Sequence, residues 1–524
     1  MSTAVVAAAA LAFSVTSAPA GAAPNNNSAK KLTKAVTLAG VMDHVEAFQQ
    51  IAETHGDRAA GRDGYQASVD YVVGELRAAG YRPTVQEFTF PYTEDYSTLE
   101  RVSPQQTTYV NGQHFLRNEF TSFQGVATGT LQAVDVVVPI GNNPPNTSSS
   151  GCEAADFAGF AAGNVALVQR GTCDFVTKAR NAQAAGAAAV IVMNEGQPGG
   201  DRQGLLRMSG DAQDVQIPAV FTTYDTGVDL LSTPTPTSVR VEVDFLSEER
   251  KTWNVLAETA KGDPSNVVMA GAHLDGVQDG AGINDNGSGS AALLETAIQM
   301  AKVKPGNKVR FAWWGAEEEG LLGSEHYVGA LSDEELDRIA LYLNFDMVAS
   351  PNYMFGIYDG DDSSGTAPVP IPEGSAEIED VFESFYEGRN LPFQDTDFSG
   401  RSDYGPFIAE DIPAGGLFTG AEDVKTPEEA ALYGGVAGES YDPCYHAPCD
   451  NLTGEGQDEA LYDLLEADYD LVGNINTEAL DVNSDAIATA VITFAYDTST
   501  VNGQRNPGKS HDGGKRVGQL ALKR

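Results

Sequence analysis

The sequence predicts an α/β protein in which a mixed, mostly parallel sheet lies between two helical layers, a three-layer α/β/α sandwich. Apolar strand-like segments alternate with helical segments from residue 253 to about residue 498, the pattern of a parallel sheet covered on both faces. Several of the strands end in polar, acidic or glycine-rich loops, where open α/β sheets place their ligands. The central region 125–246 has a different texture and predicts a second, small α/β domain inserted into the first.

Each element follows from apolar periodicity and turn residues. Helices are expected at 42–56 and 64–80, the second ending at the glycine cap Gly80. A strand is expected at 82–92. The central region predicts strands at 135–140, 165–169, 187–194 and 217–221 and a helix at 175–185. The last region predicts strands at 266–272, 308–315, 340–348, 352–360 and 415–419, and helices at 288–303, 323–330, 375–389 and between about 457 and 495.

The length of 524 residues exceeds what one core supports, since single cores rarely grow beyond about 250–300 residues. The chain is expected to begin with a signal peptide (1–24), followed by the first part of the main domain (30–124) and the insertion (125–246). The second part of the main domain, which carries the candidate metal site (247–499), and a basic, disordered tail (500–524) complete it.

The charge balance is strongly acidic, with 74 Asp and Glu against 32 Lys and Arg and a formal net charge of −42. This excludes nucleic acid as a partner, because phosphate binding requires clusters of Lys and Arg. The charge indicates a soluble, self-repelling surface. A salt-adapted or acid-tolerant habitat is the alternative, and composition leaves both open.

Residues 4–23 resemble the apolar core of a secretory signal, with small residues before a cut near Ala23. No Lys or Arg precedes the core, so the true start codon is expected upstream; a disordered alanine-rich leader is the alternative. No other stretch has the ~20 apolar residues that a membrane span requires. We therefore expect a secreted, extracellular monomer that binds neither membrane nor nucleic acid.

Four cysteines fit an exported protein. Cys444 and Cys449 are five residues apart, which suits a local bridge, and Cys152 and Cys173 lie together in the central region. No CxxC spacing is present. Two structural disulfides are therefore predicted.

The stretch from Gly271 to Ser290 carries the first candidate metal ligands. His273 ends a predicted buried strand, and Asp275 lies on the same side two residues later, where it could hold the second ring nitrogen of a ligating histidine. Asp285 lies in a glycine-rich loop, and its two oxygens could bridge two cations. The alternative is that Asp285 only caps the following helix.

The next strands supply further candidates. Glu317 and Glu318 belong to a run of three carboxylates that cannot all ionise cheaply in a shared site unless a cation is present; a solvated acidic turn is the alternative. Asp346 is a lone charge in an apolar strand, which is costly without a partner. His446 lies between Cys444 and Cys449. Two histidines and three carboxylates at separate strand ends and loops match a two-zinc hydrolase.

The motifs HxD, GxNDNxSG, GAEExGxxGS, NFDM and CYHxxCD, in this order over residues 253–455, resemble the secreted zinc aminopeptidases of the bacterial aminopeptidase S and fungal aminopeptidase Y type. The resemblance implies a zinc exopeptidase-like fold, two Zn²⁺ ions per chain and peptide substrates with a free amino terminus. It implies one zinc on His273 and Asp346, the other on Glu318 and His446, and Asp285 as the bridge.

The same resemblance implies roles for further residues. Glu317 is expected to be the general base, Tyr445 to stabilise the oxyanion, and Arg401 to bind substrate. A cis peptide bond is expected between Asp285 and Asn286, and a Leu-like residue is the expected preference at the substrate's amino terminus.

Residues 165–192 resemble the protease-associated (PA) domain, through Arg-Gly-x-Cys-x-Phe before an alanine- and glycine-rich helix. In that family the module is inserted into peptidases and receptors as a lid or contact surface.

Three alternatives stay open at this point. A carboxypeptidase or dipeptidase of the same superfamily would cut substrates with a blocked amino end. A single-zinc glutaminyl cyclase would bind one metal ion. A receptor-like binding protein without catalysis would contain almost no zinc.

Overall fold

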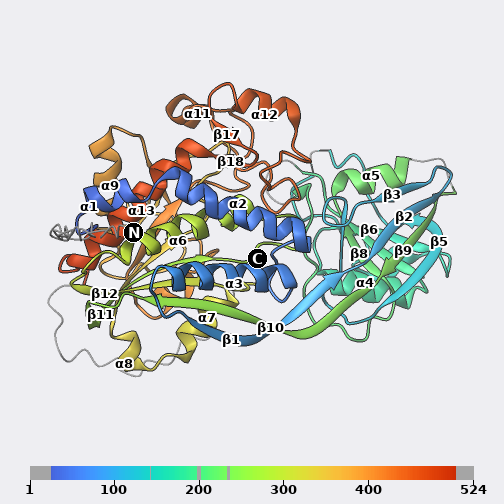
Figure 1. Cartoon of the computed structure of the whole chain (residues 1–524). Coiled ribbons are helices and arrows are strands. Elements are labelled where there is room, and N and C mark those ends of the chain that lie inside the picture. Colours follow the sequence, from blue (N-terminus) through green and yellow to red (C-terminus); the bar gives the residue numbers. More distant parts are fainter. Residues whose placement is uncertain (1–24, 142, 198–201, 233–235, 503–524) are drawn as a thin grey trace, which may run out of the picture. The chain divides into compact units, whose positions relative to one another are not determined.

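The computed structural model describes residues 25–141, 143–197, 202–232 and 236–502 (Figure 1). The predicted signal peptide at 1–24 and the tail from 503 onward lie outside this part of the chain. Two compact units result: one holds the chain up to Phe90 and from Arg250 onward, and the other is Pro91–Glu249. None of the helices in the described ranges combines the length and apolar character that crossing a bilayer requires.

The first unit is built on a mixed eight-stranded sheet. Its four central neighbours β12, β11, β13 and β16 run parallel, while β10 and β14 pair antiparallel with β12 and β16. In spatial order the strands are β1 (Thr84–Asp95), β10 (Phe245–Glu258), β12 (Asn307–Trp314), β11 (Asp263–His273), β13 (Ile339–Phe345), β16 (Ala414–Phe418), β14 (Gly356–Tyr358) and β15 (Gln394–Thr396).

Helices cover both faces of this sheet, and alternate side chains of each strand serve two separate cores. In β11, Val268 and Ala270 face one core, and Val267 and Met269 face the other. The first core packs against α1 (Ala29–Ala35), α2 (Leu38–His55), α3 (Asp63–Ala78), α6 (Gly289–Met300), α9 (Ser375–Arg389) and α13 (Thr477–Tyr496). The second packs against α7 (Leu322–Ala330), α8 (Asp333–Leu336) and α10 (Gly405–Ala409). The predicted three-layer fold class is confirmed.

The chain before α13 differs from its prediction. The single helical stretch expected between about 457 and 495 is broken by a turn with Gly473 at φ 56°, a conformation that favours glycine. The preceding loop region holds α11 (Pro427–Tyr433), and the broken stretch comprises α12 (Glu459–Leu465), β17 (Leu471–Val472), β18 (Ile475–Asn476) and α13.

The second unit has its own eight-stranded sheet, with α4 (Phe175–Ala184) and α5 (Tyr224–Ser232). It begins earlier than the expected residue 125, because strands within 91–124 pair with β9 and β8. The strand expected at 135–140 is absent: β5 ends before Asp135, whose φ is 48°, and Pro139 has no N–H for a ladder. In spatial order the strands are β3 (Thr107–Tyr109), β2 (Thr98–Ser103), β9 (Ser238–Val243), β5 (Gly125–Ala133), β6 (Val165–Gln169), β7 (Ala189–Met193), β8 (Ala219–Thr222) and β4 (Phe115–Arg117).

Both predicted disulfides are present. Cys152 bonds to Cys173 in the second unit, and Cys444 bonds to Cys449 in the first.

Candidate metal centre

Three parallel strands end beside one another and deliver most of the candidate site. β11 pairs with β12 up to His273 opposite Trp314, and with β13 up to Gly271 opposite Asn344. The residues just beyond these strands, Glu317, Glu318 and Asp346, therefore meet His273 at one edge of the sheet. Asp285 comes from the irregular turn that precedes α6, and His446 from the loop closed by Cys444 and Cys449.

His273 is oriented by a backbone carbonyl. Its Nδ1 lies 3.0 Å from the carbonyl oxygen of Asp275, which can only accept, so Nδ1 carries the proton and Nε2 faces the acids. The Asp275 carboxylate, expected to hold this nitrogen, is 3.8 Å away. Its oxygens instead accept from the backbone N–H groups of Glu317 and Glu318, at 3.3 and 3.4 Å. Asp275 thus fixes the backbone of both glutamates.

Asp285 lies between the two histidines. One carboxylate oxygen is 3.2 Å from His273 Nε2, and the other is 3.2 Å from His446 Nε2. The peptide bond from Asp285 to Asn286 is cis, as expected. Gly289 at the start of α6 lies so close to β13 that an added Cβ would be 2.3 Å from the carbonyl oxygen of Phe345. This close approach holds the turn of Asp285 against the strand that carries Asp346.

The remaining acids divide between the two histidines. Asp346 is 3.1 Å from His273 Nε2, and Glu318 is 2.9 Å from His446 Nε2. Glu317 is farther from His273, at 4.0 Å. Two groups of these residues could each hold a metal ion, because their ligand atoms lie within 4.8 Å of one another. One group is His273, Asp285 and Glu318, and the other is His273, Glu317 and Asp346.

Burial and mutual repulsion shift the titration of this cluster. Burial raises the pKa of Glu317 well above its usual value, and the Asp346 and Glu318 charges add to it against the opposing effect of His273. Burial likewise raises the pKa of Glu318. Burial alone would lower the pKa of His446, but the Glu318 charge and hydrogen bonds that His446 donates to Asp285 and Glu318 raise it to about 11. Without a cation, protons bound to Glu317, Glu318 and His446 therefore reduce the repulsion among the acids.

The donor set fits zinc. Imidazole nitrogen and carboxylate oxygen are ligands that zinc takes in catalytic sites. Glu318 Oε1 is buried and has no hydrogen-bond partner among the described residues, although a buried acceptor normally has one. A cation beside these acids would satisfy that oxygen and offset the repulsion that raises the pKa of Glu317 and Glu318.

Arg58 holds the chain on both sides of the site. It is fully buried, and its guanidinium donates to the carbonyls of Leu274 (2.6 Å), Ala281 (2.8 Å) and Gly282 (2.6 Å). These carbonyls flank the loop between His273 and Asp285. Burial lowers the pKa of Arg58 to about 10, against the charges of Asp450, Asp275 and Asp285, so it stays cationic at neutral pH. One positive charge thus lies permanently beneath the acids.

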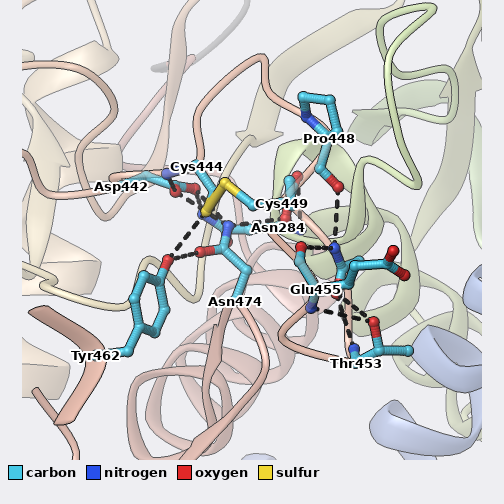
Figure 2. The surroundings of a disulfide bond; sticks show 11 residues. Asn284, Asp442, Cys444, Pro448, Cys449, Thr453, Glu455, Tyr462 and Asn474 are labelled. Atoms are coloured by element: carbon cyan, nitrogen blue, oxygen red, sulfur yellow. Dashed lines mark hydrogen bonds between the residues drawn. A yellow bond between two sulfur atoms is a disulfide. The ribbon is translucent and has the colours of Figure 1, made fainter. Parts of the chain in front are cut away.

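A buried polar network supports Asp285 from the other side. Asp450 accepts from the backbone N–H of Asp285 at 3.1 Å and of Asn284 at 2.9 Å. Figure 2 shows Asn284, Asp442 and Asn474 beside the disulfide. Asp442 accepts from the Asn284 amide at 2.7 Å and from the N–H of Cys444 at 2.8 Å. The network therefore joins the turn of Asp285 to the loop that carries His446.

Tyr445 and Arg401 meet at the mouth of the site. Arg401 Nη2 donates to the Tyr445 hydroxyl oxygen at 3.1 Å, which leaves the phenolic proton free for another acceptor. Arg401 Nη1 is paired with Glu422 at 2.7 Å. A cavity of about 260 Å³ opens here, lined by Asp285, Glu317, Asp346, Arg401, Tyr445 and His446 together with apolar side chains.

Comparison with known proteins decides the family. Residues 254–461 match peptidase family M28, and residues 129–230 match the PA domain. An aminopeptidase of Pseudomonas aeruginosa is 45% identical over 475 residues, which cover 90% of this chain and 83% of the relative. The chain belongs to peptidase family M28.

A further relative and two solved structures are also similar to this chain. A probable leucine aminopeptidase 2 of Trichophyton verrucosum is 39% identical over 472 residues, covering 88% of this chain and 85% of the relative. A solved aminopeptidase from Aneurinibacillus sp. strain AM-1 has a TM-score of 0.58 at 25% identity, covering 88% and 95% of the two chains. BSAP, a zinc aminopeptidase from Bacillus subtilis, shares the fold with a TM-score of 0.59 at 23% identity, covering 89% and 98%.

The resemblance drawn from the motifs is therefore confirmed. The protein is an aminopeptidase of family M28 with a PA domain, and peptides are its substrates.

Several residues of this M28 site escaped sequence reasoning. Arg58 lies more than 200 positions from the carbonyls that it binds. Ser402 donates to Asp346 Oδ2 at 2.5 Å, and both oxygens of the neighbouring Asp403 are buried without a hydrogen-bond partner in the described ranges. Asp450 is the last residue of the CYHxxCD motif and Asp442 lies two residues before the motif, so their closeness to His446 in the sequence was the one available signal.

Proposed function

We propose that this aminopeptidase is secreted, holds two zinc ions, and removes one amino-terminal residue at a time with Glu317 as the general base. The observation that carries the proposal is the position of Asp285, with one oxygen 3.2 Å from each histidine. A carboxylate shared in this way suits a bridge between two cations. Each histidine also has its own acid, Asp346 or Glu318.

Five residues would hold the metal. His273 and Asp346 would bind one zinc, Glu318 and His446 the other, and Asp285 both. When bound, such ions lower the pKa of a coordinated water toward ~7 and polarise the scissile carbonyl. Glu317 lines the cavity, and its oxygen is farther from His273, at 4.0 Å, than those of Asp285 and Asp346. The motif resemblance assigns it the role of base beside the metals, although it could also be grouped with His273 and Asp346 around one ion.

The remaining steps fall to side chains of this protein. Glu317 accepts the proton of the attacking water and returns it to the leaving amine. Tyr445 donates its hydroxyl proton toward the oxygen that becomes negative, while Arg401 holds the phenolic oxygen. The acids that line the cavity, Glu317 and Asp346, attract the free α-ammonium group of the substrate. Cleavage is therefore limited to the first peptide bond.

The cavity walls support an apolar first residue. Met347, Tyr358 and Phe418 line it, and a Leu-like side chain would bury apolar surface against them. Export is supported by the leader pattern at 4–23 and by the two disulfides, which persist in oxidising compartments.

The test is hydrolysis of leucyl p-nitroanilide with and without chelator and added zinc, beside the same substrate with an acetylated amino group. We expect chelator to abolish activity, zinc to restore it, and the acetylated substrate to resist cleavage. Cleavage of the blocked substrate would favour another exopeptidase class, and a protein that lacks zinc and activity would favour a binding role. Amino-terminal sequencing of the exported protein tests removal of residues up to Ala23.

A further inference from the structure

The cavity beside the metal centre has acids that neither the metal centre nor Arg401 accounts for. Its apolar walls are formed by Met347, Tyr358, Tyr404 and Phe418, and its lining also includes Asp397, Glu422 and Asp423. Of these three acids, Glu422 is paired with Arg401. Within the described ranges, no ion pair with Lys, Arg or His joins Asp397 or Asp423. Two carboxylates therefore line the cavity without a paired cation of their own among the described residues.

Asp397 is the one of the two that side-chain hydrogen bonds hold in place. Its Oδ1 accepts hydrogen bonds from Thr366 Oγ1 at 2.5 Å and from Ser364 Oγ at 3.5 Å. Its Oδ2 accepts none from the described residues. Asp397 is half-buried, whereas Asp423 is exposed and more strongly screened by water. The two hydroxyls thus fix a carboxylate in the cavity wall and leave one oxygen for a ligand.

We propose that Asp397 makes this cavity select amino-terminal lysine and arginine in addition to apolar residues. The inference rests on the proposed function, since it assigns the cavity to the side chain of the first substrate residue. A cavity lined by apolar side chains and by a carboxylate matches a side chain whose methylene stem is apolar and whose tip is cationic.

The expected discrimination follows from the charge. A half-buried carboxylate in a concave wall attracts a cation more strongly than a fully exposed one does. The methylene stem of lysine buries the same surface as a linear apolar side chain, so Asp397 adds only the contact with the ammonium group. Acidic first residues would meet like charge and be rejected.

The experiment compares lysyl, norleucyl and glutamyl p-nitroanilides, because norleucine has the stem of lysine without the charge. We expect Asp397→Asn to lower the ratio of kcat/KM for lysyl over norleucyl substrate by about tenfold, and to leave the norleucyl value within about twofold. Glu387→Gln is the matched control: it removes one exposed acid of α9 outside the cavity and should change neither value.

A lysyl-to-norleucyl ratio that is unchanged in Asp397→Asn would overturn the inference, and a larger loss in Asp423→Asn would transfer the role to Asp423 and overturn it as well. If Asp397→Asn loses norleucyl activity, Thr366→Val decides, because it keeps the acid but removes the stronger hydrogen bond. A lowered ratio then supports the inference, and an unchanged one contradicts it. Failure of the wild type to cut any of the three substrates would instead refute the proposed function.

Discussion

At the scale of single residues, Arg58 is the contact that sequence reasoning could least provide. Arg58 belongs to none of the motifs, yet its guanidinium donates hydrogen bonds to carbonyls at both ends of the loop between His273 and Asp285. It also lies 4.8 Å from the centre of the Phe48 ring. We expect its effect on metal binding to be one of position, because its side chain hydrogen-bonds to backbone carbonyls and to none of the proposed ligands.

We predict that Arg58→Met weakens zinc binding by about tenfold or more, as loss of residues that orient ligands commonly does. Three buried carbonyls lose their donor, so the free energy of unfolding should fall by about 3 kcal/mol. Competition with a chelator and chemical denaturation measure the two effects. Arg338→Met, on the exposed end of the α8 region, is the control, and equal zinc affinity in both variants would contradict the role of Arg58.

The protons bound by the metal-free cluster give a second prediction. The pKa of His446 is raised from 6.5 to about 11, after the acids outweigh burial. A raised pKa stabilises the folded state fully below the unfolded value and loses this effect as pH rises through the folded value. For His446 this window runs from pH 6.5 to about 11. The raised pKa of Glu317 acts in the same direction.

Zinc must displace these protons, so its affinity should rise with pH. We expect the increase in Tm caused by zinc to grow between about pH 6 and about pH 8.5. Calorimetry of metal-free and zinc-saturated protein across this range provides the measurement. An increase that shrinks as pH rises would show that the cluster does not exchange protons for metal.

At the scale of elements, the sequence predicted the strands that end at the candidate site, but it misplaced the boundary between the two units. Continuous apolar runs predicted strands at 266–272, 308–315 and 340–348, and β11, β12 and β13 overlap them closely. Their polar ends predicted which side chains would meet. The start of the inserted unit was misplaced because alternating apolar residues in 91–124 indicate a strand without indicating which strand it pairs with. The pairing of β2 with β9 is what places this segment in the second unit.

The loop from Cys444 to Cys449 is the element on which His446 depends. It holds His446 at φ 53°, a left-handed conformation that is unfavourable outside glycine and needs support from its surroundings. We predict that Cys444→Ser with Cys449→Ser lowers leucyl p-nitroanilide turnover by about tenfold or more and weakens binding of one zinc. The matched double variant Cys152→Ser with Cys173→Ser should keep both its turnover and its zinc binding. Comparable losses of turnover and zinc in the two double variants would contradict the role of the Cys444–Cys449 loop.

At the scale of the whole molecule, the dominant feature is the formal charge of −42. Like charges repel in the folded state, and salt screens this repulsion because the Debye length falls from about 30 Å at 0.01 M to about 3 Å at 1 M. The sequence predicted this property completely, since it depends on composition and not on contacts. It could not predict that one cation, Arg58, would be buried beside the acids Asp275, Asp285 and Asp450.

We therefore expect the Tm of the zinc-saturated protein to rise by a few degrees between about 0.02 M and about 0.5 M NaCl. Differential scanning calorimetry is the measurement, with potassium chloride as a check on ion identity. A Tm that falls with salt would mean that ion pairs outweigh the net repulsion.

The central claim is a two-zinc site in which Glu317 moves protons without binding metal. Zinc content and leucyl p-nitroanilide turnover of Glu317→Gln, measured on the same preparation as the wild type, test it most directly. We expect two zinc ions per chain in both proteins and a fall in kcat of about a thousandfold in the variant. A single zinc ion in the wild type, or a variant that keeps its turnover, would contradict it.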